Sequence, residues 1–180
     1  QANAENEIID AKLWWPNGFG EQNLYTFDIK LTENGQVVDS ETKRIGFREA
    51  RLVREKDEWG ESFCHEVNGV RFFAMGADYI PEDNIMSRYS KERTYDLLKQ
   101  CRDCNFNTIR VWGGGIYPHD YFFDACDELG LVVFNDLMFA CAEVPGHQAM
   151  FDNIEAEVRE NLIRIRHHAS IVLICGNNEI

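Results

Sequence analysis

Apolar and polar residues alternate along residues 24–31, over the length of one strand with one buried face. The dipeptide Asn34-Gly35 follows and favours a tight type I′ hairpin turn, so residues 36–40 are expected to return as the partner strand. A further short alternation covers residues 44–48. Because tight turns separate these segments and no helical period interrupts them, residues 1–50 predict the last few strands of a β-sandwich.

A connecting hairpin is predicted over residues 51–75. Two strand-like segments, residues 62–67 and 70–75, flank Asn68-Gly69, which is a second tight-turn signal. The end of this hairpin, residues 72–75, is also expected to form the first strand of the unit that follows.

Beyond the hairpin, apolar segments of strand length alternate with segments of helical period. Ser90 can cap the first helical segment, while Pro118 can begin the second and Gly130 can end it. The four expected strands cover residues 72–75, 108–112, 131–134 and 171–175, and the three expected helices cover residues 90–105, 118–129 and 148–168.

Repeated strand–helix units build either a doubly wound sheet or a barrel. A doubly wound sheet would carry a glycine-rich phosphate turn after its first strand, and Gly76-Ala77-Asp78-Tyr79 lacks that pattern. Polar and aromatic residues follow each strand instead, at the edge where barrels carry their active sites. The pattern therefore predicts an α/β fold, a partial (β/α)8 TIM barrel consisting of strands 1–4.

The formal net charge is −13, which argues against a nucleic-acid partner because such proteins present a basic face to phosphates. No apolar run approaches the roughly 18 residues that cross a bilayer, so no membrane segment is predicted. The chain does not begin with Met and stops just after a strand-like segment, so we interpret it as an internal piece of a longer protein. Its pattern indicates neither a compartment nor an oligomeric state.

Six cysteines are present, and most lie in apolar stretches where a free thiol behaves as a small hydrophobic group. Cys101 and Cys104 form a CxxC pair, but no second pair accompanies them and they lie within a predicted helix. His167 and His168 lie at a helix end without a matched set of ligands. Buried free thiols are therefore favoured over a metal site, and no cofactor is expected.

The residues that follow the four strands are of the types that commonly bind sugars. Carboxylates and amides form hydrogen bonds with ring hydroxyls, and an indole face packs against the apolar face of a pyranose. The candidates are Asp78 after the first strand, Arg110 and Trp112 at the second, Asp136 at the third, and Asn178 and Glu179 after the fourth.

Glu179 is the strongest candidate for chemistry, because a glycosidase needs a carboxylic acid that protonates the leaving oxygen. An apolar, partly closed site would raise the pKa of such an acid toward neutrality. Its place just after the apolar residues 171–175 fits that site, although the spacing fits a solvated loop carboxylate equally well.

Arg110 alternates with the apolar Ile109 and Val111, so it is expected to point into the barrel interior. A buried arginine needs a carboxylate partner, and none is evident nearby in the sequence, so the partner is expected downstream. The run Gly113-Gly114-Gly115 lacks phosphate-binding spacing and is interpreted as a tight turn that lets a ligand approach the backbone.

Six segments form a specific pattern through their order and spacing. They are Leu13-Trp14-Trp15-Pro16-Asn17-Gly18, Arg44-Ile45-Gly46-Phe47-Arg48, Gly76-Ala77-Asp78-Tyr79-Ile80-Pro81, Thr108-Ile109-Arg110-Val111-Trp112-Gly113-Gly114-Gly115, Asp136-Leu137-Met138-Phe139-Ala140-Cys141 and Gly176-Asn177-Asn178-Glu179. Together they resemble glycoside hydrolase family 2, and within it the β-mannosidases. The resemblance implies that residues 1–50 end an immunoglobulin-like β-sandwich and that residues 51–180 form the N-terminal half of a (β/α)8 catalytic barrel.

The resemblance also implies a reaction, the retaining hydrolysis of terminal β-D-mannose from an oligosaccharide or glycoconjugate. In that reaction Glu179 would be the general acid/base, Asn178 would bind the 2-hydroxyl, and Trp112 would lie in the mannose subsite. Arg110 would support the nucleophile, a Glu on the seventh strand that lies beyond residue 180.

Asp78 and Asp136 are expected from the same resemblance to line the pocket. Alternatives are another family 2 exo-glycosidase (a β-glucosaminidase, β-galactosidase or β-glucuronidase) and a non-catalytic carbohydrate-binding homologue, which would be expected to have lost Glu179. Because a retaining mechanism needs two carboxyl groups about 5 Å apart, the chain on its own is expected to be inactive.

Overall fold

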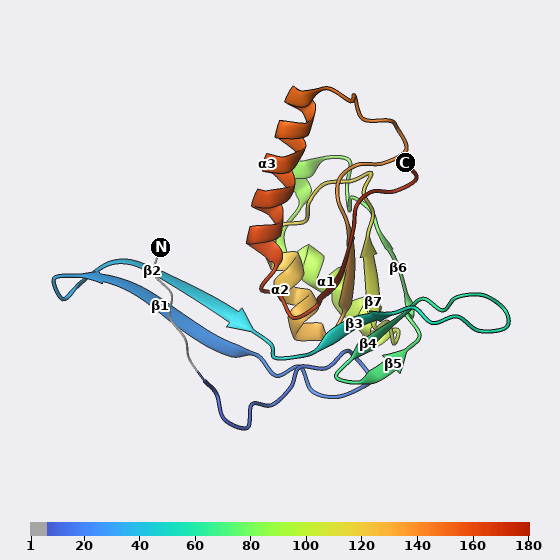
Figure 1. The fold of residues 1–180 in the computed structure, drawn as a ribbon. Helices are drawn as coiled ribbons and strands as arrows, with labels where there is room; N and C mark the ends of the chain where they lie inside the picture. Colours follow the sequence, from blue (N-terminus) through green and yellow to red (C-terminus); the bar gives the residue numbers. More distant parts are fainter. Residues whose placement is uncertain (1–6) are drawn as a thin grey trace.

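The computed structural model describes residues 7–180, which form three separate sheets and three α-helices (Figure 1). The largest sheet is parallel and has the order β6-β7-β8-β9. Its strands are β6 (Gly76–Tyr79), β7 (Thr108–Val111), β8 (Val132–Asp136) and β9 (Ile171–Cys175). Each neighbouring pair in space is also consecutive among these four strands, which is the order that a barrel requires.

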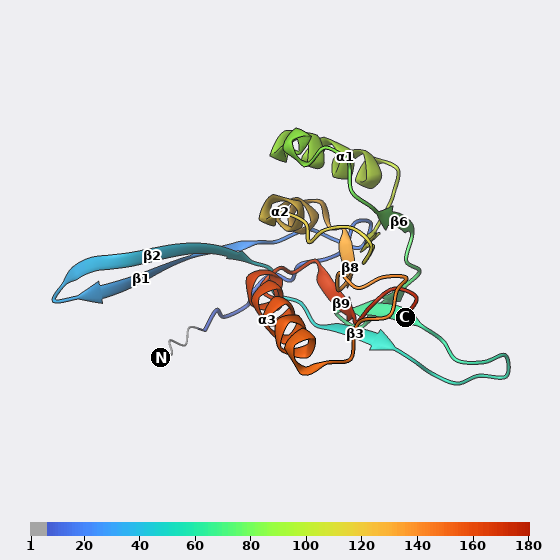
Figure 2. The same ribbon diagram turned by 90° about the horizontal axis from the view of Figure 1, so that it is seen from above.

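Three helices connect these strands: α1 (Lys91–Asp103), α2 (Asp120–Leu129) and α3 (Gln148–Ile165). They lie along one side of the sheet, as the two views in Figures 1 and 2 show. A doubly wound fold would instead place helices on both faces. The fold is therefore α/β with a parallel sheet, and the single helical layer is consistent with the predicted barrel half.

The predicted signals set the start of α1 and the end of α2, but α2 begins at Asp120, two residues after the predicted Pro118. The Ser90 hydroxyl accepts a hydrogen bond from the Arg93 N–H and caps α1, and Gly130 ends α2 in the left-handed conformation with a φ of 72°. His147 caps α3 through its ring, which accepts a hydrogen bond from the Met150 N–H. That helix ends at Ile165, three residues before the predicted end.

The first barrel strand lies four residues later than predicted. Val70–Phe72 is β5, which pairs antiparallel with β4 (Cys64–Val67), so it belongs to the connecting hairpin. The Asn107 side chain then fixes the crossing, because it accepts from the Met75 N–H and donates to the Phe73 carbonyl. The parallel sheet starts only at Gly76, where a Cβ atom would lie 1.7 Å from the Thr108 carbonyl oxygen.

The N-terminal strands form a two-stranded antiparallel ribbon, β1 (Tyr25–Glu33) and β2 (Gln36–Ile45), joined by the predicted Asn34-Gly35 turn. Both turn residues have positive φ, as a type I′ turn needs. The predicted third strand at residues 44–48 is not separate, because β2 continues through Ile45. Within residues 7–180 no second sheet covers this ribbon, and the β-sandwich remains a prediction.

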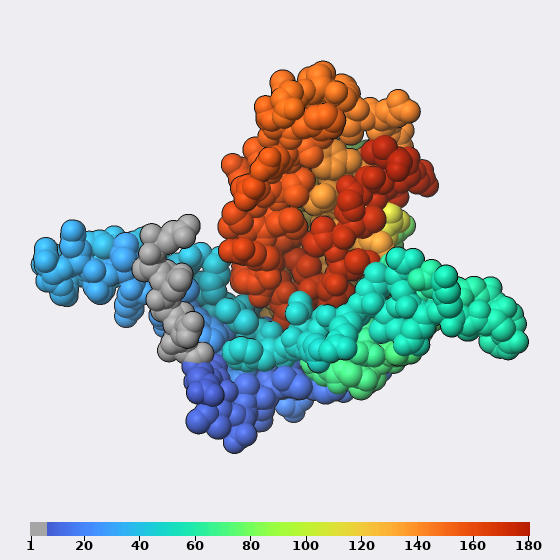
Figure 3. All heavy atoms as spheres, in the orientation of Figure 1, coloured from blue at the N-terminus to red at the C-terminus, as the bar shows by residue number. Residues whose placement is uncertain are grey.

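Figure 3 shows that this ribbon projects to one side of the molecule, while the loop between β3 (Ala50–Val53) and β4 projects to the other. Between them, Trp14 joins the N-terminal segment to the helical layer. Trp14 is fully buried, and its indole N–H donates to the Asp127 carbonyl over 2.8 Å. A second link comes from Arg48, which donates to the carbonyls of Ala169 and Ile171.

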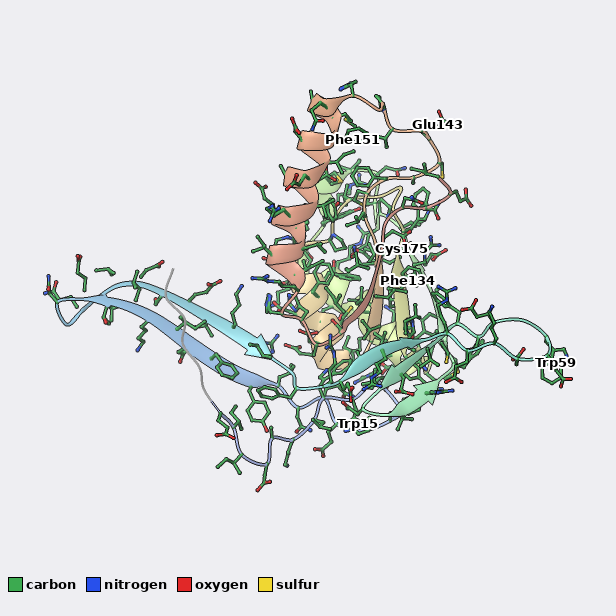
Figure 4. The ribbon with its side chains drawn as sticks, viewed as in Figure 1. Trp15, Trp59, Phe134, Glu143, Phe151 and Cys175 are labelled. Carbon is green, nitrogen blue, oxygen red and sulfur yellow. The ribbon has the colours of Figure 1, made fainter. Side chains whose placement is uncertain are left out.

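We expect Trp14→Phe to lower the free energy of unfolding by about 1–2 kcal/mol, because the buried Asp127 carbonyl loses its indole donor. Urea denaturation measures the change. The matched control is Trp59→Phe, at the exposed tip of the β3–β4 loop in Figure 4, which should shift stability by less than about 0.5 kcal/mol. Equal losses for the two variants would contradict the role given to Trp14.

Candidate active site

Four of the six candidate residues form one hydrogen-bonded cluster at the carboxyl ends of the strands. Arg110 on β7 is its centre, and Nη2 donates to Asp136 Oδ2 over 2.8 Å and to Asn178 Oδ1 over 2.7 Å. Its Nη1 lies 3.4 Å from Asp78 Oδ1. The parallel register explains the meeting, because Asp78 and Phe134 flank Arg110 on the neighbouring strands.

The carboxylate of Asp136 is fully buried, so its charge requires partners. Arg110 supplies one partner, and the backbone N–H of Gly113 supplies another over 3.1 Å. Partial burial opposes the charge of Arg110, but its hydrogen bond to Asp136 and its attraction to Asp136 and Asp78 raise its pKa. The prediction that no carboxylate partner for Arg110 lies nearby, so that it pairs beyond this chain, is therefore wrong. The partner lies 26 residues later and is brought close by the sheet register.

Phe134 packs its ring against the Arg110 guanidinium. The Arg110 Cζ atom lies 5.5 Å from the centre of the Phe134 ring, within the range of a cation–π contact. Phe134 lies in the middle of the sheet in Figure 4, near Cys175 at the end of β9. The Phe134 ring thus packs against Arg110 of the charged cluster, a contact that the sequence pattern did not predict.

A short backbone ladder joins the loop after β8 to the segment after β9. The Asn178 N–H donates to the Phe139 carbonyl, and the Cys141 N–H donates to the Asn178 carbonyl, each over 2.9 Å. Ala140 and Asn178 form the corresponding parallel bridge. The position of Asn178 is therefore fixed through its backbone by this ladder and through its side chain by Arg110.

Glu179 follows directly and has a φ of 57°, a conformation that is uncommon for a residue with a side chain. Its Oε2 atom lies 3.6 Å from the Cys141 sulfur, and its side chain is exposed. The expected apolar, partly closed surroundings are thus not provided by residues 7–180, although the strand-end position is as predicted.

Trp112 lies beside the cluster and is not bonded to it. Its indole folds back over Gly114, where a Cβ atom would lie only 2.0 Å from the ring, and Gly113 packs against the Leu137 carbonyl in the same way. The glycine run forms the predicted turn, but the space that it leaves is filled by Trp112 and the loop after β8. The indole lines a small aromatic pocket that also includes Tyr79, Tyr89 and His119.

Glu82, which follows the first strand, faces α1 and not the cluster. Its Oε1 accepts from the Tyr79 hydroxyl over 2.5 Å and from the Thr94 hydroxyl over 2.6 Å. Burial and this hydrogen bond to Glu82 raise the pKa of Tyr79 well above its ordinary value, so the phenol stays protonated. These contacts fasten the loop after β6 to α1 beside the Trp112 pocket.

Cys141 is the site residue that sequence reasoning missed. Most cysteines were expected in apolar stretches, with buried thiols favoured for Cys101 and Cys104, but Cys141 and Cys104 are both exposed. The signal that could have identified it is its place after the third strand, at the end of the segment 136–141, which contributed only to the family resemblance.

Across residues 7–180 no group of three or more His, Cys, Asp or Glu side chains is arranged to hold a metal ion. In the same residues no helix has the length and apolar character needed to cross a membrane.

Comparison with known proteins finds relatives over nearly the whole chain. A sequence model described as "Glycosyl hydrolases family 2" matches residues 1–48. Beta-mannosidase B of Thermothelomyces thermophilus is 45% identical over 175 residues, which are 96% of this chain and 20% of that protein. Beta-mannosidase B of Aspergillus oryzae is 40% identical over 178 residues, or 99% of this chain and 21% of that protein. The chain spans about a fifth of the length of these relatives.

Solved structures agree with the sequence relatives. The crystal structure of a β-D-mannosidase from Dictyoglomus thermophilum matches 93% of this chain, and 21% of its own, with a TM-score of 0.90 and 45% identity. An exo-chitosanase from Amycolatopsis orientalis matches 90% of this chain, and 19% of its own, with a TM-score of 0.77 and 25% identity.

The fold and these relatives make this chain similar to a segment of known glycoside hydrolases. The chain is thus similar to glycoside hydrolases of family 2, and its relatives there include β-mannosidases, as the resemblance implied.

We expect Asp136→Ala to lower the free energy of unfolding by about 2–4 kcal/mol, because Arg110 and the Gly113 N–H lose a buried acceptor. The matched control is Glu155→Ala, which breaks an exposed ion pair with Arg159 on α3 and should cost less than about 1 kcal/mol. Urea denaturation compares the two variants. A loss at Asp136 no larger than that at Glu155 would show that the buried pair does not organise the strand ends.

Proposed function

We propose that this chain supplies part of the catalytic barrel of a retaining exo-β-mannosidase that removes terminal β-D-mannose, with Glu179 as its general acid/base. The observation that carries the proposal is the Arg110 cluster, which fixes Asn178 and thereby the segment that presents Glu179 at the end of β9. Similarity to β-mannosidases over nearly the whole chain supports the choice of sugar.

In the first step the Glu179 carboxyl would donate its proton to the glycosidic oxygen as the bond to the sugar breaks. A second carboxylate, outside this chain, would form the glycosyl–enzyme bond from the opposite face. In the second step Glu179, now a carboxylate, would take a proton from water as the water oxygen attacks the sugar carbon. The pair returns to its starting protonation when the sugar leaves.

Asn178 would bind the sugar through its amide nitrogen. Arg110 occupies the amide oxygen, so Nδ2 is the end of the amide that remains to donate to a hydroxyl. Asp136 is fully buried beneath Arg110, so we propose that it acts by holding the guanidinium. Asp78 is more exposed than Asp136 and lies at the rim of the cluster, where it could accept from a sugar hydroxyl.

Another family 2 exo-glycosidase is the second candidate, because the fold is shared with an exo-chitosanase. The lower identity to that protein, 25% against 45% for the β-mannosidase structure, favours mannose. A panel of nitrophenyl β-glycosides offered to the full-length protein that contains this chain decides between them. Preference for the glucosaminide, galactoside or glucuronide over the mannoside would retire the mannosidase proposal and keep the mechanism.

We expect Glu179→Gln in the full-length protein to lower kcat/KM for an aryl β-mannoside with a poor leaving group by about 10²–10⁴-fold, the usual contribution of a general acid. A dinitrophenyl mannoside should lose far less, because its leaving group needs no proton. Glu155→Gln on α3 is the matched control and should leave both substrates unchanged. Equal losses on the two substrates would assign Glu179 a role other than acid catalysis.

The 180-residue chain by itself is expected to release no nitrophenol from any of these substrates, because it lacks the second carboxylate. The comparison is between this chain and the full-length protein under the same conditions. Activity of the purified chain that disappears in Glu179→Ala would contradict this expectation and would require a nucleophile among residues 1–180.

A further inference from the structure

The thiol of Cys141 lies between the two residues that the proposed mechanism places next to the sugar. Its sulfur is 3.6 Å from Glu179 Oε2 and 3.4 Å from Asn178 Nδ2, both within hydrogen-bond range for sulfur. A thiol has one weak donor and a weak acceptor, so Cys141 can accept from the amide and donate to the carboxylate at the same time.

The direction of these bonds is set from the other end of the cluster. The Arg110 guanidinium can only donate, so the Asn178 atom that it contacts over 2.7 Å must be the amide oxygen. The amide nitrogen therefore faces the sulfur, and the thiol hydrogen is left to point at Glu179. A continuous hydrogen-bonded chain thus runs from the buried ion pair to the proposed acid.

The backbone at Cys141 has a left-handed conformation, which residues with side chains seldom adopt. Cys141 has a φ of 58° and Glu179 a φ of 57°, and such conformations persist in residues with side chains only where the surroundings impose them. The ladder between Cys141, Asn178 and Phe139 holds the Cys141 N–H and the Asn178 carbonyl, directly before Glu179, through two backbone hydrogen bonds. Two left-handed residues face each other across this ladder, and their side chains meet.

We propose that Cys141 is a positioning residue that orients the Glu179 carboxyl group, an inference that rests on the proposed function of Glu179. The thiol holds Oε2 and leaves Oε1 to carry the proton toward the glycosidic oxygen. A weak donor suits this task, because a strong one would stabilise the carboxylate and lower the pKa of the acid.

The test uses the full-length protein and two variants, Cys141→Ala and Cys141→Ser. For an aryl mannoside with a poor leaving group, the alanine variant should lose about tenfold in kcat/KM, the effect of one hydrogen bond in the transition state. Its kcat/KM for dinitrophenyl mannoside should stay unchanged. The serine variant should recover most of the loss, and its stronger donor should move the basic limb of the pH profile to lower pH.

Cys104→Ala is the matched control, because Cys104 is also an exposed thiol and lies at the end of α1, away from the cluster. It should behave as the unmodified protein. Equal losses of the alanine variant on both substrates, or no loss on either, would overturn the inference. Thermal unfolding of each variant separates a folding defect from a positioning defect, and the serine variant provides the comparison if the alanine variant does not fold.

The two proposals fail in different ways. If Glu179→Gln lowers kcat/KM equally for the substrate with a poor leaving group and for dinitrophenyl mannoside, the acid assignment itself is wrong. If Glu179→Gln lowers kcat/KM mainly for the poor leaving group and Cys141→Ala changes kcat/KM for neither substrate, Glu179 acts as the acid without help from the thiol.

Discussion

The ion pair between Arg110 and Asp136 is the interaction on which the rest of the site depends. Asp136 is fully buried, and a buried carboxylate without a partner would be strongly unfavourable, so the guanidinium must stay where it is. A guanidinium is planar and carries its donors in a fixed fork, so holding one edge of Arg110 also fixes the other. The Nη2 atom that binds Asp136 also donates to Asn178 after β9, and Nη1 lies beside Asp78 on β6, so one charge organises the ends of all four strands.

The two ends of the parallel sheet divide the work between stability and chemistry. At the amino-terminal end, Asp127 accepts from the Ser170 backbone, lies 2.7 Å from His168, and offers its carbonyl to Trp14. These groups are buried and hydrogen-bonded to one another, so they join the hairpins to the helical layer. At the other end, Glu179 and Cys141 are exposed and held in strained conformations, which is the usual distribution in barrels.

Local sequence signals predicted those parts of the fold that local physics decides. A serine hydroxyl before a helix, a glycine after one and an Asn-Gly turn each act within a few residues, and Ser90, Gly130 and Asn34-Gly35 did so. The first parallel strand was misplaced because a side chain 32 residues away, that of Asn107, fixes where the hairpin ends. The partner of Arg110 was missed for the same reason, since only the sheet register brings Asp136 beside it. The exposure of Cys141 depends on a backbone ladder between two loops, which apolar periodicity does not reveal.

The orientation of Asn178 connects this ion pair to the recognition of a sugar. An amide can accept through its oxygen or donate through its nitrogen, and a hydroxyl group can pair with either. An asparagine that was free to rotate would therefore discriminate poorly between orientations of a sugar hydroxyl. Arg110 removes that freedom because it binds the oxygen. Under the proposed function a sugar hydroxyl must then accept from the amide nitrogen, which leaves the hydroxyl's own hydrogen to donate to a second acceptor. A carboxylate nucleophile is the acceptor that the mechanism brings to that side of the ring. The buried pair would therefore set which end of Asn178 meets the sugar, as well as where Asn178 lies.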